Sequence, residues 1–244
     1  MKRISTVWMA AAKNLWWKLL IILAAMSAAE IGLYRSAVIA SQNQYEDFYM
    51  KSFPVLVEEA GLKLVFFAAL MAVTACCCLQ GSRFSGKNYT LQRLPMAEWK
   101  ITALWAVTHL ACFVILWAAQ VVLISALWSM YAARFHPAAP GLDLLVSFYN
   151  NGFLHAMLPL ADVTRWIYLV AYWLCMAFLT ATFGFFQRRG RYRISLLIML
   201  ACYFTLIKEI GSFAPNLIFT ILCLIVAAVD AFAMWEVYHE AKPD

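Results

Sequence analysis

Six long apolar stretches, separated by shorter polar segments, restrict how this chain can fold more than any other feature. A helix that crosses a bilayer needs about 20 mostly apolar residues. Segments of or near that length cover residues 19–40, 62–79, 101–132, 166–186, 194–210 and 216–237. Only 13% of the residues are charged, whereas a soluble domain has about 25%. The sequence therefore predicts an all-α integral membrane protein with six transmembrane helices, folded as a single domain over residues 1–244.

Lysine and arginine residues gather in alternate polar segments. Thirteen of the 19 lie in the N-terminal segment, the second-to-third loop, the fourth-to-fifth loop and the tail. Cytoplasmic segments carry the excess of basic residues, so we expect both termini on the inner side of the plasma or inner cell membrane, with residues 41–61 and 134–165 as outer loops. Apolar residues of the second outer loop are too few to span, and we expect short helices on the outer face. This rule explains the net charge of +6 without a nucleic-acid partner.

The first 18 residues precede the first apolar stretch and have two distinct faces. On a helical wheel, one side carries Ile4, Val7, Trp8, Ala11 and Leu15, and the other carries Lys2, Arg3, Thr6, Lys13 and Asn14. Trp16 and Trp17 come just before the apolar stretch, and indole rings favour the membrane interface. The pattern predicts an amphipathic helix over residues 1–18 that lies on the inner membrane surface; a frayed cytoplasmic start is the alternative.

Four charged residues lie inside the apolar stretches or at their ends: Glu30, Lys208, Glu209 and Asp230. Charge in lipid is costly and is usually paired or placed in a cavity. Glu30 lies about 16 Å along the first stretch, where it either lines a substrate path or pairs with Arg35 or Lys208. For Asp230 the favoured interpretation is a carboxylate that reaches the inner interface.

Residues that could perform catalysis or bind a metal do not stand in a recognisable arrangement. The four histidines are scattered, and the seven cysteines form no Cys-x-x-Cys pair. The run from Gly81 to Lys87 resembles a phosphate loop, but Asn88 stands where the magnesium-binding hydroxyl is needed. We therefore expect no enzymatic activity, no metal and no cofactor on this chain.

The loop between the second and third stretches, residues 81–100, has the most distinctive sequence. It contains Gly86-Lys-Asn-Tyr-Thr-Leu-Gln-Arg-Leu-Pro-Met-Ala-Glu-Trp-Lys100. Residues 89–94 can form a short helix that ends before Pro95, because the residue before proline disfavours helical geometry. We expect this helix to lie flat beneath the bilayer.

This loop resembles the coupling helix of permease subunits of type-2 ABC exporters. The matching positions are Gly86, Tyr89, Thr90, Leu91, Arg93, Leu94, Pro95 and Met96. In that family an interfacial elbow helix precedes six spans, and the coupling helix docks into a separate ATP-binding subunit. The prominent outer hairpin of the family usually follows the fifth span, whereas here the longest outer loop, 134–165, follows the third. The chain is therefore more similar to the smaller permeases found beside bacterial peptide-resistance and regulatory operons.

The resemblance implies a permease subunit that exports a peptide or a lipophilic compound. ATP and Mg²⁺ would bind to a partner ATPase, and a second permease, identical or homologous, would complete the transporter. Tyr89, Thr90, Leu91, Arg93, Leu94 and Pro95 would then couple the chain to the ATPase. The alternative, from another class, is a membrane sensor or scaffold that does not transport. An ATP-binding cassette encoded in an adjacent reading frame would favour the first.

Overall fold

The computed structural model describes residues 2–44, 51–81, 97–135, 140–191, 193–208 and 213–240. Within these ranges the chain is helical and has no β-strand. The helices are α1 (Lys2–Gln44), α2 (Phe53–Glu59), α3 (Leu62–Gly81), α5 (Glu98–Phe135), α6 (Pro140–Asn150), α7 (Gly152–Met157), α8 (Val163–Arg188), α9 (Ser195–Lys208) and α10 (Phe213–Glu240). The prediction of an all-α protein is confirmed.

Five of these helices are long and apolar enough to cross a membrane, rather than the six expected. They are α1, within which the candidate span is Leu15–Gln42, and α3, α5, α8 and α10. The expected fifth span, 194–210, corresponds to α9, which has 14 residues and a shorter apolar part, Ser195–Phe204. At 1.5 Å per residue, α9 is about 21 Å long, which is less than the hydrocarbon thickness of a bilayer.

The structure has one continuous N-terminal helix where two were expected. Helix α1 runs for 43 residues from Lys2, so the expected elbow helix over residues 1–18 is not separated from the first span. Its first 20 residues contain no proline or glycine and include the consecutive residues Ala10, Ala11 and Ala12. Alanine has the highest helix propensity and nothing here interrupts the helix, so the backbone continues through Trp16 and Trp17.

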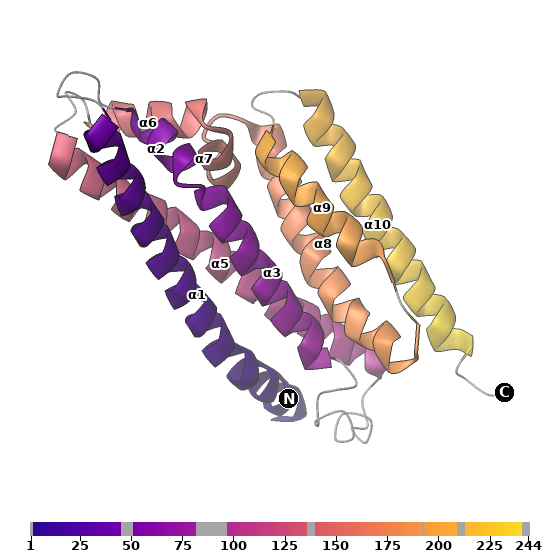
Figure 1. Ribbon diagram of the computed structural model, residues 1–244. Helices are drawn as coiled ribbons and strands as arrows, with labels where there is room; N and C mark the ends of the chain where they lie inside the picture. Colours follow the sequence, from indigo (N-terminus) through magenta and orange to yellow (C-terminus); the bar gives the residue numbers. More distant parts are fainter. Residues whose placement is uncertain are drawn as a thin grey trace.

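The long helices form one bundle, and the short ones gather at one end of it (Figure 1). We call the short helices α2, α6 and α7 the cap. The start of α1 and the end of α10 both lie at the opposite end, called here the terminal end. The short helices expected within residues 134–165 are present as α6 and α7. Trp117 on α5 anchors the cap by donating a 2.8 Å hydrogen bond to the Met157 carbonyl at the end of α7.

Helix α8 is the centre of the bundle. It packs against α5, α10, α3 and α9, and 72% of its span is buried, compared with 17% of the span of α10. Large side chains fill this core; the Phe113 and Trp173 rings, for example, stack with centroids 5.8 Å apart. Helix α10 instead exposes Ile218, Leu224 and Phe232. An apolar face of this kind suits lipid or another membrane protein.

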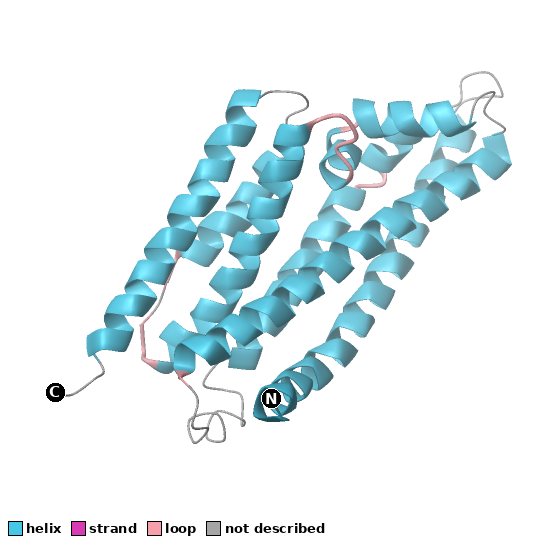
Figure 2. Cartoon of the chain, turned by 180° about the vertical axis from the view of Figure 1, so that it is seen from behind, coloured by secondary structure: helices cyan, strands magenta, loops and turns pink. Residues whose placement is uncertain are grey.

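The link between α8 and α9 explains why α9 is short. The described parts of this link, 189–191 and 193–194, run from the terminal end toward the cap before α9 begins (Figure 2). Gly190 has a φ of 70°, a left-handed conformation that glycine adopts without strain. Ser195, the first residue of α9, contacts Asp230, which lies ten residues, or about 15 Å, before the end of α10. Helix α9 therefore occupies only the part of the bundle nearer the cap.

Candidate functional site

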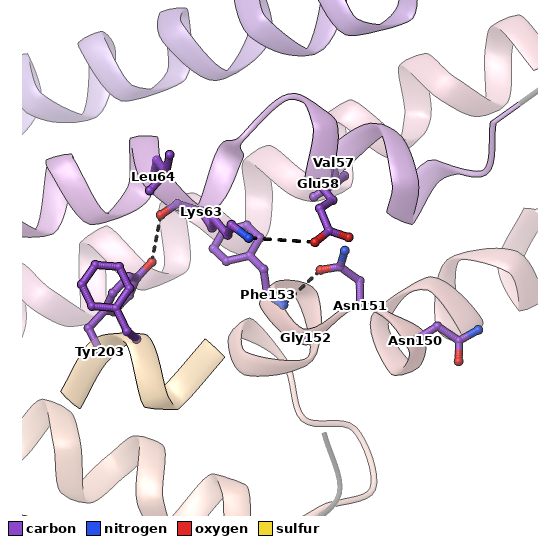
Figure 3. Close-up of a pocket in the computed structure, with 10 residues that line it drawn as sticks. Val57, Glu58, Lys63, Leu64, Asn150, Asn151, Gly152, Phe153 and Tyr203 are labelled. Carbon is purple, nitrogen blue, oxygen red and sulfur yellow. Dashed lines mark hydrogen bonds and ion pairs between the residues drawn. The ribbon is translucent and has the colours of Figure 1, made fainter. Parts of the chain in front are cut away.

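A pocket of about 420 Å³ opens where the cap meets the bundle. Figure 3 shows its residues arriving from α2, α3, the α6–α7 junction and α9. Its polar groups are Glu58, Lys63, Asn150 and Asn151. Its lining residues are Val57, Glu58, Lys63, Leu64, Asn150, Asn151, Gly152, Phe153, Tyr203 and Phe204.

Asn151 holds the cap side of this pocket together. It is the N-cap of α7, and its side-chain oxygen accepts hydrogen bonds from the backbone N–H groups of Phe153 and Leu154, at 3.0 and 3.1 Å. Its amide nitrogen donates to the Pro54 carbonyl of α2 at 3.1 Å. One side chain thus satisfies the free N–H groups at the start of α7 and joins two helices of the cap.

The opposite wall is fixed by Lys63 and Tyr203. The Tyr203 hydroxyl donates to the backbone carbonyl of Lys63 at 3.2 Å, which ties α9 to α3. The Lys63 ammonium lies 3.9 Å from the Glu58 carboxylate, and both side chains are substantially exposed. The pocket therefore presents a charge of each sign beside aromatic rings, a surface that suits an amphipathic ligand.

The cap also buries His155, which lies on α7. Burial lowers the pKa of His155 below its ordinary value, and the nearby Arg165 guanidinium lowers it further. The neutral form of the ring is therefore favoured, and the rings of His155 and Tyr149 pack edge to face, with centroids 6.0 Å apart. This histidine contributes packing to the cap rather than a positive charge to the pocket.

Glu30, expected inside the bundle, is fully buried on α1. Its carboxylate accepts a 2.9 Å hydrogen bond from the amide of Gln120 on α5. Among the described side chains the partner of Glu30 is the neutral amide of Gln120 rather than Arg35, and a place for Glu30 along a substrate path stays a prediction. The side chain of Lys208 and all of Glu209 lie outside the described residues.

Asp230, which the sequence led us to expect at the inner interface, is buried among helices. Its side chain is 2% exposed. Its carboxylate accepts hydrogen bonds from Ser195 at 3.0 Å and Thr182 at 3.4 Å. We call these three residues the Asp230 cluster; it joins α10, α8 and the first residue of α9. A carboxylate beside a helix N-terminus is favourable because free N–H groups and the helix dipole are positive there.

A second cluster, which the sequence did not reveal, joins α8 and α10 near the cap. Arg165 was counted as an outer-loop cation, but it is 1% exposed. Its guanidinium donates to the Asn216 side chain at 3.1 Å. The Asn216 amide in turn donates to Thr164 at 3.1 Å and to Asp162 at 3.4 Å. We call Asp162, Thr164, Arg165 and Asn216 the cap cluster.

The six residues expected to couple the chain to an ATPase lie outside the described residues; they are Tyr89, Thr90, Leu91, Arg93, Leu94 and Pro95. The helices on either side are described: α3 ends at Gly81 and α5 begins at Glu98, both at the terminal end. The Glu98 carboxylate forms an ion pair with Arg189, the first residue after α8. The Arg189 guanidinium also stacks on Phe185, 3.9 Å from its ring centroid.

The described residues hold no group of three or more histidine, cysteine or acidic side chains that could bind a metal. No protein-family model, curated protein or solved structure matches the chain.

Proposed function

We propose that this chain is the membrane-spanning permease subunit of an ABC transporter of the type-2 exporter kind. It resides in the plasma or inner membrane, exports a peptide or a lipophilic compound, and depends on a separate subunit that binds ATP and Mg²⁺. A second permease, identical or homologous, completes the path. The exposed apolar face of α10 is a surface that a second membrane subunit could cover.

The observation that carries this proposal is the position of the two described ends of the coupling segment, residue 81 and residues 97–100, at one end of the bundle. The segment follows α3 and leads into α5 at the same end as the start of α1 and the end of α10. Its described last part holds Glu98, which pairs with Arg189. A partner bound to this segment would therefore contact the membrane helices through α5 and through the α8–α9 link.

This attachment gives a physical route for the energy input. Force on Glu98 reaches Arg189, and the link that follows Arg189 leads to Ser195 at the start of α9. Ser195 lies on Asp230, inside the bundle. A displaced link would shift the α9 start relative to α8 and α10, which is the kind of two-state helix movement that alternating access requires.

The experiment is to purify the tagged chain together with any ATP-binding cassette subunit that an adjacent reading frame encodes and to measure ATPase activity in nanodiscs. Leu91→Asp, Arg93→Glu and Leu94→Asp should each lower the stimulation of the ATPase by the permease about tenfold or more, because one broken interface contact of about 1.4 kcal/mol already gives a factor of ten. Leu142→Asp, at an exposed position on the cap, is the matched control and should leave the stimulation unchanged.

Glu98→Gln tests the link separately. A partly exposed ion pair contributes less than about 1 kcal/mol to stability, so this variant should fold and bind the ATPase while stimulating it less. A chain that is stable alone, co-purifies with no ATPase and is insensitive to all four substitutions would contradict the proposal. That result would favour the membrane sensor or scaffold.

A further inference from the structure

A second pocket lies between the cap-side ends of α1 and α5. Its volume is about 280 Å³, and its polar lining consists of Tyr34 and Arg35 from α1 and Tyr131 and Arg134 from α5. The ends of α1 and α5 meet at this corner of the bundle (Figure 1). The pocket is separate from the pocket of Figure 3, with which it shares no lining residue.

The two arginines of this pocket differ from the other described cations near the cap. Lys51 pairs with Glu59 at 2.6 Å and Lys63 approaches Glu58 at 3.9 Å. Arg165 belongs to the cap cluster. Among the described side chains, neither Arg35 nor Arg134 has a carboxylate partner, and the described partner of Arg134 is the neutral amide of Gln42, at 2.6 Å. Two guanidinium charges therefore face one pocket without a described counter-charge.

The pocket also contains a buried hydroxyl group, that of Tyr34, without a described hydrogen-bond partner. The Tyr34 side chain is 2% exposed, although it lines the pocket. Buried hydroxyl groups almost always have a partner. The neighbouring Tyr131 hydroxyl does have one, the Lys51 carbonyl at 3.4 Å. An acceptor oxygen placed in the pocket would satisfy Tyr34.

We propose that this pocket binds a phosphate group. Guanidinium groups match the tetrahedral oxygens of phosphate with paired N–H donors, and a phosphate oxygen can also accept the hydrogen bond of Tyr34. Arg35 is seven residues, or about 10 Å, from the end of its candidate span. A long arginine side chain reaches the headgroup level from that depth. The phosphate comes either from an anionic lipid headgroup or from a soluble phosphate compound.

The first arm of the experiment uses inorganic phosphate. The full chain is purified in a non-ionic detergent, and its thermal unfolding midpoint is measured against phosphate concentration, with sodium chloride at equal ionic strength as the reference. Saturable binding at about a hundredfold excess over Kd should raise the midpoint by roughly 5–10 °C. Arg35→Gln and Arg134→Gln should abolish the shift. Tyr34→Phe should weaken binding about three- to tenfold, the value of one hydrogen bond.

The second arm uses lipid. The chain is placed in nanodiscs of phosphatidylcholine with or without phosphatidylglycerol, and retained lipid is counted by native mass spectrometry. Selective retention of phosphatidylglycerol by the wild type, lost in Arg35→Gln and Arg134→Gln, identifies a headgroup site. A response to inorganic phosphate without lipid retention identifies a soluble ligand. Both results support a phosphate site.

Control variants make the proposal falsifiable. Lys63→Gln removes a cation from the other pocket and should change neither arm. Arg35→Lys with Arg134→Lys keeps the charge but loses the paired donors, and binding should fall without loss of folding. The proposal is overturned if the arginine variants retain the wild-type response, if neither probe binds, or if phosphate binds only after Glu46→Gln and Asp47→Asn. The last outcome would mean that the chain's own carboxylates neutralise these arginines.

Discussion

The cap cluster and the Asp230 cluster fasten the same two helices, α8 and α10, but they do so differently. The cap cluster encloses a buried cation and joins residues at the starts of the two helices. The Asp230 cluster lies 14 residues further along α10, about 21 Å away, and includes the first residue of α9. The first therefore fixes two helices, whereas the second also holds a third element that follows a non-helical link. Movement should therefore cost least at the Asp230 cluster, where the third element follows a non-helical link.

The largest effect should come from the cap cluster. Asn216→Leu removes the described acceptor of the Arg165 guanidinium and the donor to Thr164 and Asp162. A buried charge that loses a hydrogen-bond partner destabilises the folded state, so we expect the free energy of unfolding to fall by about 2–3 kcal/mol. Thermal unfolding in detergent would measure it. Asn150→Leu, at an exposed asparagine of α6, should change stability by less than about 0.5 kcal/mol. Equal losses in the two variants would show that the cap cluster contributes no more to stability than an exposed side chain.

The Asp230 cluster should give a smaller effect that depends on the substitution. Asp230→Leu leaves the hydroxyl of Ser195 without its described acceptor and should cost about 1–2 kcal/mol. Asp230→Asn keeps a carbonyl acceptor of the same shape and should cost less than half as much. The comparison is made by chemical denaturation of both variants. If Asp230→Asn is as damaging as Asp230→Leu, the charge rather than the hydrogen bond holds the start of α9.

The smallest effect concerns the pH dependence of stability, to which the cap cluster contributes through Asp162. Partial burial opposes ionisation of Asp162, but hydrogen bonds from Thr164 and from the backbone N–H of Arg165 outweigh it, so its pKa lies below the ordinary value. A carboxyl whose pKa is lowered by folding adds stability above its unfolded pKa of about 4 and loses it as the pH falls. Unfolding midpoints of the wild type should therefore decline between pH 5 and pH 3 more steeply than those of Asp162→Asn. Equal slopes for the wild type and Asp162→Asn would contradict this prediction.

The sequence was sufficient to predict the long apolar helices because their length and composition are local properties. The all-α class and the short helices within 134–165 followed from the same information. The sixth span is not confirmed at α9, because a run of apolar residues does not reveal that the chain passes through Arg191 and Arg193 before the helix begins. The separate elbow helix was not found, since an amphipathic pattern does not interrupt a backbone that lacks proline and glycine.

The partners of the buried polar groups could not be predicted, because they depend on contacts between distant segments. Glu30 bonds to Gln120, 90 residues away, and Arg165 bonds to Asn216, 51 residues away. An arginine at the end of a loop normally indicates an exposed residue that sets the orientation of the chain in the membrane. No feature of the neighbouring sequence distinguishes Arg165 from the other loop arginines. The coupling positions Tyr89 to Pro95 remain predictions, supported by the attachment of Glu98 to the bundle.

The oblique course of α5 has a mechanical consequence. This 38-residue helix begins beside α8, where Glu98 meets Arg189, and finishes beside α1, where Arg134 meets Gln42. It is thus a diagonal strut about 57 Å long across the bundle (Figures 1 and 2). A strut under axial load transmits displacement instead of absorbing it. A push at Glu98 would therefore be directed along α5 toward the pocket of Arg35 and Arg134 at the opposite corner.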